Sequence, residues 1–457
     1  MRSWRSARRV GGKRSRSPWS GRGSFTGLLP LGDELLFVGG AGRGGHYADV
    51  ERRALGGSAL TGPEPAPDAT PLARGDWPGF RGRGDSHAGT DLPVRWSEAD
   101  VAWRVALPGY GQSSPVVWQG QVFVTSAVGP EKETLVLTAV DLETGEVRWR
   151  RRFSASQRLP ATDTVSRAAP TPVVDATGVF AFWESGDVVA TTHQGETLWK
   201  RSLTADYGDF AGNHGIGSSP VLTDAAVVVQ VTHAGPSYFV ALDKGTGANL
   251  WKADRDPGVA WSSPALLLTA AGARIVSSAA GRVEALDADT GESLWSLNGV
   301  EKNHVPSATL GDGLIVVASS EVGHNFALRP GATPDAPPVV AWRAAGVSSG
   351  FGSPLLHGGC ALFVNKAGGV TCVDVGSGAS LWKHRLADAC WASPLASGDL
   401  AYFFTKKGVT VVLRTGAEGA EVVAKNAVAT DDTVYGVAAV KGAFVVRTGS
   451  ELARLGR

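Results

Sequence analysis

Apolar strand-like stretches and tight polar turns alternate along most of the chain, and residues 139–149 show this unit most clearly. Two apolar stretches flank a turn in which Asp141 can accept backbone N–H groups two or three residues on, and Gly145 can adopt a positive φ. Trp149 then supplies a large apolar surface for packing. The pattern predicts half of a β-hairpin unit, which cannot bury that surface alone.

The same order of residues returns three more times: Asp, then Thr or Ser three positions later, then Gly, then Trp four positions after the Gly. These copies begin at Asp243, Asp287 and Asp374 and close at Trp251, Trp295 and Trp382. Weaker copies close at Trp199, Trp342 and Val423, where the Trp is lost, and Trp103 precedes the first copy. We predict structural roles for the four turn aspartates and for the closing indoles, which should dock between neighbouring sheets with their N–H groups on backbone carbonyls: Trp103, Trp149, Trp199, Trp251, Trp295, Trp342 and Trp382.

A second element keeps step with the first, namely Ser or Thr followed by Pro at the start of an apolar stretch. It occurs at Pro115, Pro172, Pro220, Pro264, Pro354 and Pro394, with degraded versions at residues 305–307 and 436–437. Successive closing positions lie 40 to 52 residues apart. A repeat of this length holding four short strands is typical of a β-propeller. Eight openings and eight closings therefore predict an all-β, eight-bladed propeller of four-stranded antiparallel blades.

The two ends of the repeat region predict how the ring closes. Residues 437–455 have room for three strands, whereas residues 101–107, with Trp103, supply a closing strand without partners. If this N-terminal strand completes the last blade, the ring has no free edge.

The sequence divides into a propeller over residues 76–457 and a different segment over residues 1–75. The first 22 residues carry eight Arg and Lys residues, and residues 61–71 are rich in Pro and Ala. We expect this segment to be a poorly ordered basic tail and linker, although residues 35–39 resemble a blade strand. Its basic start lacks the uninterrupted apolar core of a signal peptide, so the sequence alone leaves export open.

Charge and cysteine content narrow the function classes further. The 44 Lys and Arg residues balance 43 Asp and Glu residues, which argues against nucleic-acid binding. No run of about 18 apolar residues exists, so no membrane span is expected, and we expect a monomer. Cys360 and Cys372 flank one predicted hairpin. We expect these two to be small buried side chains, with a Cys360–Cys372 bond as the alternative. Together with Cys390 they are too few for a full disulfide framework.

The repeated turn, Gly and Trp, together with the entry segment over residues 76–118, resemble the bacterial PQQ-binding-like β-propeller repeat proteins, a group often described as BamB-like. The resemblance covers about residues 76–455 and implies the propeller fold. It also implies a location in the periplasm or cell envelope, with the cytoplasm as the alternative. Because the repeat is a packing device, the resemblance says less about function.

The enzymes of this fold, the quinoprotein alcohol dehydrogenases, imply a specific set of residues. They hold pyrroloquinoline quinone (PQQ) above Ca²⁺ in the central channel, with a disulfide between adjacent cysteines, a catalytic Asp, and Glu and Asn ligands. This chain has no adjacent cysteines, and its repeat aspartates stand in turns. We therefore expect no catalytic residue and no cofactor, with PQQ and Ca²⁺ as the alternative.

In a propeller, the loop from the outer strand of one blade to the inner strand of the next arrives at the mouth of the channel. The residues just before each Ser-Pro element should therefore surround that mouth. They are Tyr110, Gln112, Arg167, Asn213, His214, Trp261, Asn303, His304, Phe351, Trp391 and Tyr435. Aromatic and hydrogen-bonding side chains that converge there suit a small polar ligand or an extended peptide. The alternative is that they plug the channel and satisfy one another.

These observations predict a non-catalytic propeller that presents its channel mouth and inter-blade loops to a protein or a small-molecule partner. A PQQ-dependent alcohol or sugar dehydrogenase is the alternative. A third hypothesis is a sugar or peptide binder that uses Trp261, Trp391 and Tyr435. His214 and His304 could serve as metal ligands or general bases, but neither has a ligand-spaced partner in the sequence, so we predict no metal site.

Overall fold

The computed structural model describes residues 24–31, 34–42, 45–54, 75–89, 92–162, 166–212 and 214–456. The chain divides into two compact units, Met1–Pro65 and Ala66–Arg457. In the first unit, β1 (Ser24–Leu31), β2 (Glu34–Gly42) and β3 (Gly45–Ala54) form an antiparallel sheet in the order β1-β2-β3. This sheet differs from the tail and linker expected over residues 1–75. The apolar residues 35–39, which resemble a blade strand, lie within β2, the central strand.

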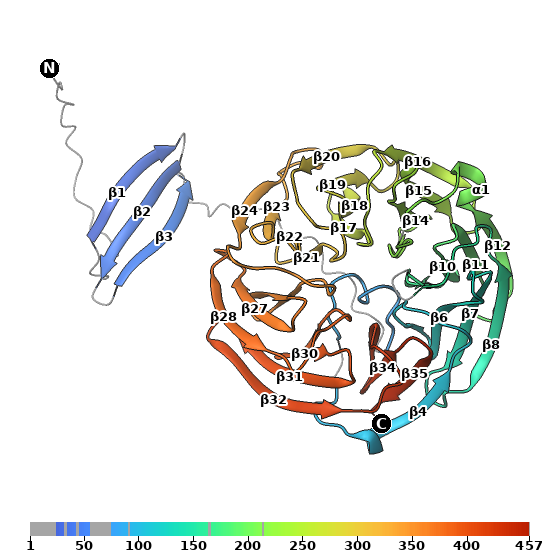
Figure 1. Cartoon of the computed structure of the whole chain (residues 1–457). Coiled ribbons are helices and arrows are strands. Elements are labelled where there is room, and N and C mark those ends of the chain that lie inside the picture. The colour runs from blue at the N-terminus through green and yellow to red at the C-terminus, as the bar shows by residue number, and fades with distance from the viewer. Residues whose placement is uncertain are drawn as a thin grey trace. The chain divides into compact units, whose positions relative to one another are not determined.

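The second unit is a ring of eight four-stranded antiparallel sheets (Figure 1), which confirms the predicted fold. The first four sheets comprise β5 (Val116–Trp118), β6 (Gln121–Val128), β7 (Thr134–Asp141) and β8 (Val147–Ser154); β9 (Val173–Val174), β10 (Val179–Phe182), β11 (Asp187–Thr191) and β12 (Thr197–Ser202); β13 (Val221–Leu222), β14 (Ala226–Val231), β15 (Ser237–Asp243) and β16 (Asn249–Arg255); β17 (Ala265–Thr269), β18 (Gly272–Ala279), β19 (Arg282–Asp287) and β20 (Ser293–Asn298).

The other four sheets complete the ring. They comprise β21 (Thr309–Gly311), β22 (Leu314–Val317), β23 (Phe326–Arg329) and β24 (Val339–Arg343); β25 (Leu355–His357), β26 (Cys360–Val364), β27 (Gly369–Asp374) and β28 (Ser380–Arg385); β29 (Leu395–Ser397), β30 (Leu400–Phe404), β31 (Val409–Gly416) and β32 (Gly419–Ala427); β33 (Gly436–Val440), β34 (Ala443–Arg447), β35 (Glu451–Leu455) and β4 (Val101–Ala106). Two short helices, η1 (Glu98–Asp100) and α1 (Leu203–Tyr207), also lie in this unit. No helix among the described residues is long and apolar enough to cross a membrane.

The ring closes as the sequence predicts. Strand β4 pairs antiparallel with β35, and Trp103 lies opposite Arg454. The eighth sheet is therefore built from both ends of the propeller sequence, and no strand at its outer edge is missing.

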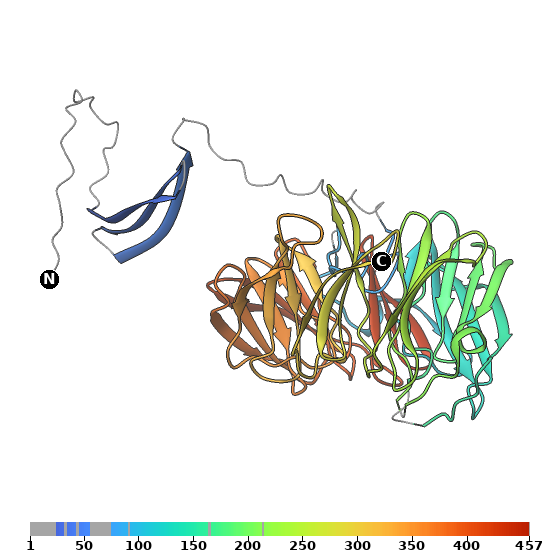
Figure 2. The ribbon, with the colours of Figure 1, turned by 90° about the horizontal axis from the view of Figure 1, so that it is seen from above.

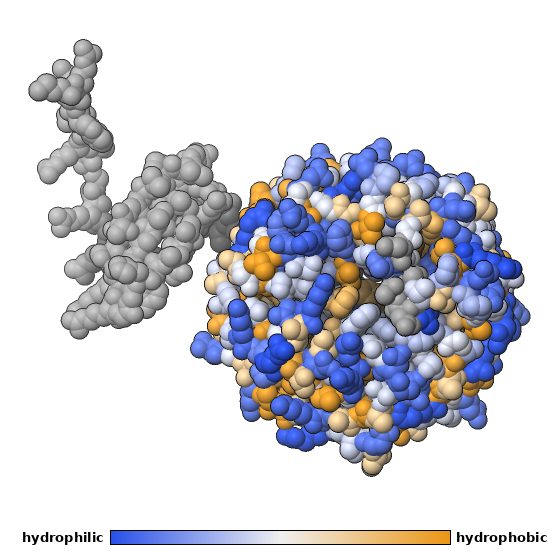
Figure 3. Space-filling model, in the orientation of Figure 1, coloured by the Kyte–Doolittle hydropathy of each residue, from blue (hydrophilic) through white to orange (hydrophobic). Residues whose placement is uncertain are grey.

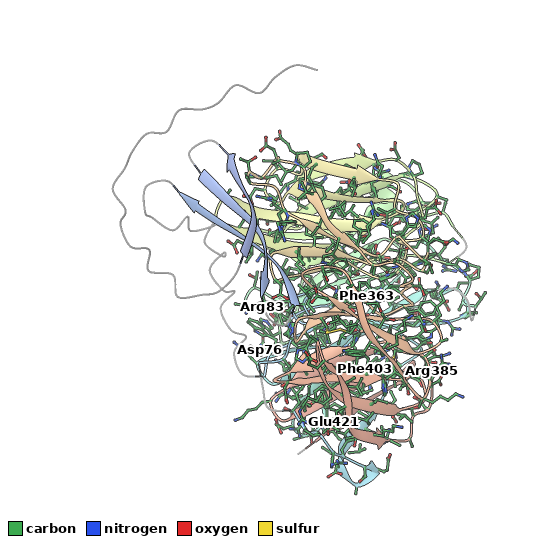
Figure 4. The ribbon with its side chains drawn as sticks, turned by 90° about the vertical axis from the view of Figure 1, so that its left-hand side faces the viewer. Asp76, Arg83, Phe363, Arg385, Phe403 and Glu421 are labelled. Atoms are coloured by element: carbon green, nitrogen blue, oxygen red, sulfur yellow. A yellow bond between two sulfur atoms is a disulfide. The ribbon has the colours of Figure 1, made fainter. Side chains whose placement is uncertain are left out.

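Strand direction gives the ring two distinct faces. In every sheet the first strand is the inner one, and all strands run roughly along the ring axis (Figure 2). We call the face that carries the blade-to-blade loops the mouth face. The opposite face carries the hairpins between first and second strands and between third and fourth strands, and we call it the turn face. In Figure 4, which shows the ring from the side, Asp76 and Arg83 lie at one edge and Arg385 lies towards the other.

Each turn aspartate orders its own turn. Asp141 accepts hydrogen bonds from the backbone N–H groups of Glu143 (2.9 Å) and Thr144 (2.8 Å) and from the Thr144 hydroxyl (3.1 Å). Asp243 repeats the pattern with Gly245 and Thr246. Partial burial alone would raise the pKa of Asp141, but these bonds and that from Arg148 lower it below its usual value. The carboxylate therefore stays ionised and keeps the turn formed.

The closing tryptophans join neighbouring sheets. Six donate the indole N–H to a backbone carbonyl in the following sheet, at 2.7 to 3.0 Å: Trp103 to Leu142, Trp149 to His193, Trp199 to Lys244, Trp251 to Ala288, Trp342 to Val375 and Trp382 to Gly416. Trp295 packs in the apolar cluster with Ile315 and Val317 of the next sheet. The turn glycine of the following sheet lies directly against the ring, so a Cβ atom on Gly291 would be 2.4 Å from Trp251. The turn and the Trp of the repeat thus form a contact between two blades.

Cys360 and Cys372 form a disulfide between β26 and β27, with their Cα atoms 5.5 Å apart. The expectation that Cys360 and Cys372 are unbonded side chains was therefore wrong, and the bond is the alternative that the sequence left open. The hairpin places Cys372 opposite Leu362, two residues from Cys360, and the Cα separation lies within the usual range for a disulfide. Cys390 is free and buried, and burial raises the pKa of its thiol to about 12.

Candidate functional site

Side chains from five successive blade-to-blade loops meet on the mouth face. The rings of Phe351 and Trp391 stack with centroids 4.3 Å apart, and Trp391 meets Tyr435 edge-on at 5.5 Å. Tyr435 meets Tyr110 at 6.1 Å, and the Arg167 guanidinium lies 4.5 Å from the Tyr110 ring centroid. All five side chains are partly exposed. We call this set the aromatic arc. On this face of the ring, polar and apolar residues are interspersed from the rim to the centre (Figure 3).

Charged groups flank the aromatic arc on both sides. The Lys366 ammonium lies 5.7 Å from the Phe351 ring centroid and the Lys406 ammonium lies 5.6 Å from that of Trp391, both within cation–π range. The Tyr110 hydroxyl donates to the Asp432 carboxylate and lies 2.7 Å from the Tyr435 hydroxyl. Burial, and then the bond to Asp432, raise the pKa of Tyr110 well above its usual value. The arc therefore offers apolar ring faces edged by cations, with one acidic position.

Two polar contacts hold the loops beneath the arc. The Gln112 backbone N–H donates to the Arg167 carbonyl, and the Gln112 side-chain oxygen accepts from the Arg167 backbone N–H, both at 3.0 Å. Arg447 is fully buried below Gly111 and donates to the carbonyls of Thr448 (2.6 Å) and Thr125 (3.2 Å). Burial lowers the pKa of Arg447 to about 9. Sequence reasoning missed Arg447 because it ends an ordinary apolar strand and no motif surrounds it.

Trp261, His214 and His304 form a second cluster. The His214 and Trp261 rings lie 5.8 Å apart, and the Trp261 indole N–H donates to the Gly215 carbonyl at 2.9 Å. The Trp261 backbone N–H donates to the His304 carbonyl at 2.6 Å, and His304 Nδ1 is 2.6 Å from the Val259 carbonyl. The structure thus brings together three predicted residues, mainly through backbone bonds that fix the loops.

Asn303, one of the two predicted asparagines, joins neither cluster. Asn303 is buried, where its amide donates to Ser278 Oγ (3.0 Å) and the Arg282 carbonyl (2.9 Å) and accepts from the Gly281 N–H (2.8 Å). These bonds hold the β18–β19 hairpin and satisfy the side chain within the protein. Asn213 lies outside the described residues.

A cavity of about 300 Å³, which no sequence pattern predicted, opens beside these loops. It is lined by Leu159, Pro160, Thr162, Glu184, Phe210, Ala211, Gly212, Gly215 and Ile216. The Glu184 carboxylate is buried, accepts from the Ala168 N–H and pairs with Lys132 at 3.2 Å. Nearby, His233 packs against Phe210, and its Nδ1 accepts from the N–H groups of Ala211 (3.0 Å) and Gly235 (2.9 Å). Burial lowers the pKa of His233.

The described residues do not fit the cofactor of the quinoprotein dehydrogenases. They contain no group of three or more His, Cys, Asp or Glu residues that could hold a metal ion. At the mouth, Asp432 is engaged by Tyr110. The disulfide lies in the apolar core of the β25–β28 sheet and not against the channel. We therefore derive no chemical step through PQQ.

Comparison with known proteins places this fold among two groups. BamB from Moraxella catarrhalis superposes with a TM-score of 0.57 at 15% identity, covering 78% of this chain and 97% of that one. Quinohemoprotein alcohol dehydrogenase from Comamonas testosteroni superposes with a TM-score of 0.60 at 14% identity, covering 85% and 82%. At these identities, the likeness concerns the fold alone.

Sequence comparison is more specific. The outer membrane protein assembly factor BamB of Yersinia pestis is 26% identical over 227 residues, which are 49% of this chain and 52% of that protein. The chain thus spans about half the length of this curated relative. The family model described as outer membrane protein assembly factor BamB matches residues 88–235 and 184–422. Because these matches cover most of the chain, the protein belongs to this family of PQQ-repeat propellers.

Proposed function

We propose that this protein is a non-catalytic binding protein of the cell envelope, whose aromatic arc docks a polypeptide segment of a partner protein. The observation that carries the proposal is the continuous contact of Phe351, Trp391, Tyr435, Tyr110 and Arg167 across five loops of a rigid ring. Partly exposed aromatic rings are the usual anchors of protein interfaces. Family membership supports the type of role, since the related proteins are described as assembly factors.

Two further features support this proposal. Lys366, Lys406 and Arg167 edge the arc, so it suits a segment in which apolar or aromatic side chains alternate with acidic ones. The Cys360–Cys372 disulfide is of the kind that persists in oxidising compartments such as the periplasm.

The test is capture of partners from an envelope extract of the source organism. We expect the unaltered protein to retain one or more partners that the double variant Trp391→Ala/Tyr435→Ala loses. The matched control is Tyr207→Ala, which removes a partly exposed aromatic ring from α1, outside the arc. Equal capture by all three proteins contradicts the proposal. Recovery of the native protein with a co-eluting quinone absorbance band, and dye reduction on alcohols after addition of PQQ and Ca²⁺, would support the dehydrogenase instead.

A further inference from the structure

The segment over residues 76–89 crosses the turn-face end of the channel and pairs with its inner strands. We call it the channel strap. Trp77 and Val117 of β5 exchange both backbone hydrogen bonds at 2.8 Å. The Val174 N–H of β9 donates to the Pro78 carbonyl at 2.9 Å. At the other end, Ala396 of β29 forms a parallel bridge with His87 of the strap: the Ala396 carbonyl accepts from the Ala88 N–H, and the Ala396 N–H donates to the Ser86 carbonyl.

Pairing of the strap follows from the register of the blades. The first hairpin of each blade closes at the turn face, as at Trp118–Gln121 in β5–β6 and Ser397–Leu400 in β29–β30. In an antiparallel pair, the residue before the closing pair turns its N–H and C=O away from the second strand. Val117 and Ala396 occupy this position, and the strap bonds to both.

Three other inner strands have an apolar residue at the equivalent position. The closing pairs are Thr223–Ala226, Thr269–Gly272 and Gly311–Leu314, so the equivalent residues are Leu222 in β13, Leu268 in β17 and Leu310 in β21. In the part of the chain that the structure describes, no strand or bridge pairs with the channel side of β13, β17 or β21. These strands therefore present backbone edges of the kind that the strap covers elsewhere.

The same three leucines line a cavity of about 620 Å³, whose other wall is the strap from Pro78 to Asp85. This volume lies within the range of about 300–1,000 Å³ that is usual for ligand pockets. Leu268 is 51% exposed although it belongs to an inner strand. Arg83, which lines the cavity, is labelled in Figure 4, where it lies at the turn face of the ring. The cavity is thus on the opposite face from the aromatic arc.

The charges around this cavity balance one another. The buried Arg81 guanidinium donates to Ser86 Oγ (3.0 Å), Thr309 Oγ1 (2.7 Å) and the Ala308 carbonyl (3.3 Å), which anchors the strap across the channel. Lys244 pairs with Asp175 at 2.7 Å. The rest of the lining adds Arg83, Asp85 and Asp224 to small and apolar residues, among them Phe80, Pro264, Leu266 and the three leucines. Because the three cations and the three carboxylates of the lining offset one another, the cavity favours an uncharged occupant with apolar side chains over an ionic one.

We propose that this cavity binds an extended, uncharged apolar segment of another polypeptide, which adds a strand to the channel edge of β17. Its backbone pairs with Leu268 as Trp77 pairs with Val117, and its side chains contact Leu222 and Leu310. This mode, in which main-chain bonds give affinity and pockets select side chains, is established for exposed sheet edges. The inference does not depend on the aromatic arc, because the two sites lie on opposite faces.

The first test uses a fluorescein-labelled, end-blocked hexapeptide, Leu-Thr-Val-Thr-Leu-Thr, titrated with the full-length protein and followed by anisotropy. Two matched peptides carry backbone N-methyl groups on one or the other alternate set of residues, which removes the donors on that side of the strand. We expect binding of the parent peptide and at least about tenfold weaker binding of one methylated form. Equal binding of all three, or no binding of the parent at millimolar protein, overturns the proposal.

The second test uses two leucines of nearly equal exposure. Leu268→Asp places a charge in the cavity, whereas Leu250→Asp alters a 50% exposed leucine on the outer strand β16. We expect only Leu268→Asp to weaken peptide binding, by about tenfold or more, with Leu268→Thr as a milder variant that keeps strand propensity. Equal weakening by the Leu250 variant overturns the proposal. Dimerisation that depends on Leu268 would assign the edge to a second copy and overturn it too. Trp391→Ala/Tyr435→Ala should leave peptide binding unchanged, which separates this site from the arc.

Discussion

The contact between a closing Trp and the turn glycine of the next blade gives a quantitative prediction at Trp251 and Gly291. Gly291 has φ +74°, and an added Cβ would lie 2.4 Å from the Trp251 ring. Gly291→Ala should therefore cost about 1–2 kcal/mol for the left-handed backbone and about 1–3 kcal/mol for overpacking against the indole. Trp251→Ala should cost about 3–5 kcal/mol through the cavity it leaves.

The two substitutions should not be additive. In the Trp251→Ala protein the ring that meets the new methyl group is gone, so Gly291→Ala should then cost only the backbone strain of about 1–2 kcal/mol. The double variant should thus be more stable than the sum of the single changes by about 1–3 kcal/mol. Gly313→Ala is the matched control, because Gly313 has φ +68° and nothing within 4 Å of an added Cβ.

Urea unfolding followed by far-UV circular dichroism measures these differences, provided that the denaturant slopes of the variants agree. Additivity to within about 0.5 kcal/mol would refute the reasoning. So would an equal cost for Gly291→Ala and Gly313→Ala, because the indole contact would then contribute nothing.

Three further predictions follow from buried polar groups and from the disulfide. Burial lowers the pKa of His233, so the free energy of unfolding should be highest above about pH 6.5 and should fall as the pH drops from there through the lower folded-state pKa. Melting temperatures between pH 5 and 8 should show this fall, and His233→Asn should flatten it; identical profiles would contradict the assignment. Reduction of the Cys360–Cys372 disulfide should lower the free energy of unfolding by about 2–3 kcal/mol. Addition of a reductant should therefore lower the urea midpoint of the unaltered protein, whereas the midpoint of the Cys360→Ala/Cys372→Ala variant should not change. Asn303→Ala should lower the free energy of unfolding by about 2–3 kcal/mol through three lost hydrogen bonds, without changing partner capture. If capture is lost while stability is unchanged, Asn303 belongs to the binding surface instead.

The architecture was largely predictable because its repeat is local. Asp141, Gly145 and Trp149 lie within one hairpin. Their spacing therefore predicts the turn and also the indole surface that must pack against a neighbouring blade. Trp103 without a preceding turn was enough to predict that β4 closes the last sheet. These features depend on contacts between neighbouring residues or neighbouring blades. Such contacts recur with every repeat, so the repeat in the sequence shows them directly.

The candidate sites were predictable only in part. The topology places Tyr110, Trp391 and Tyr435 at one mouth, and they do meet there. The role of Arg81 could not be predicted, because its partners Ala308 and Thr309 lie more than 200 residues away in the sequence and no pattern connects them to it. Asn303 was misplaced because a loop position does not reveal whether its amide turns outward or into a hairpin.

The closing sheet has a consequence for the order of events during synthesis. Strand β4 leaves the ribosome more than 300 residues before β35, its partner, has been made. Until then, β4 has no partner strand, and the apolar residues that join the first sheet to the last, such as Val122 and Phe444, cannot yet pack together. Non-local pairing of this kind is slow, so closure should be the last step of folding. A chain that lacks even the final hairpin would remain an open arc, so the ring can close only after synthesis of the last strands.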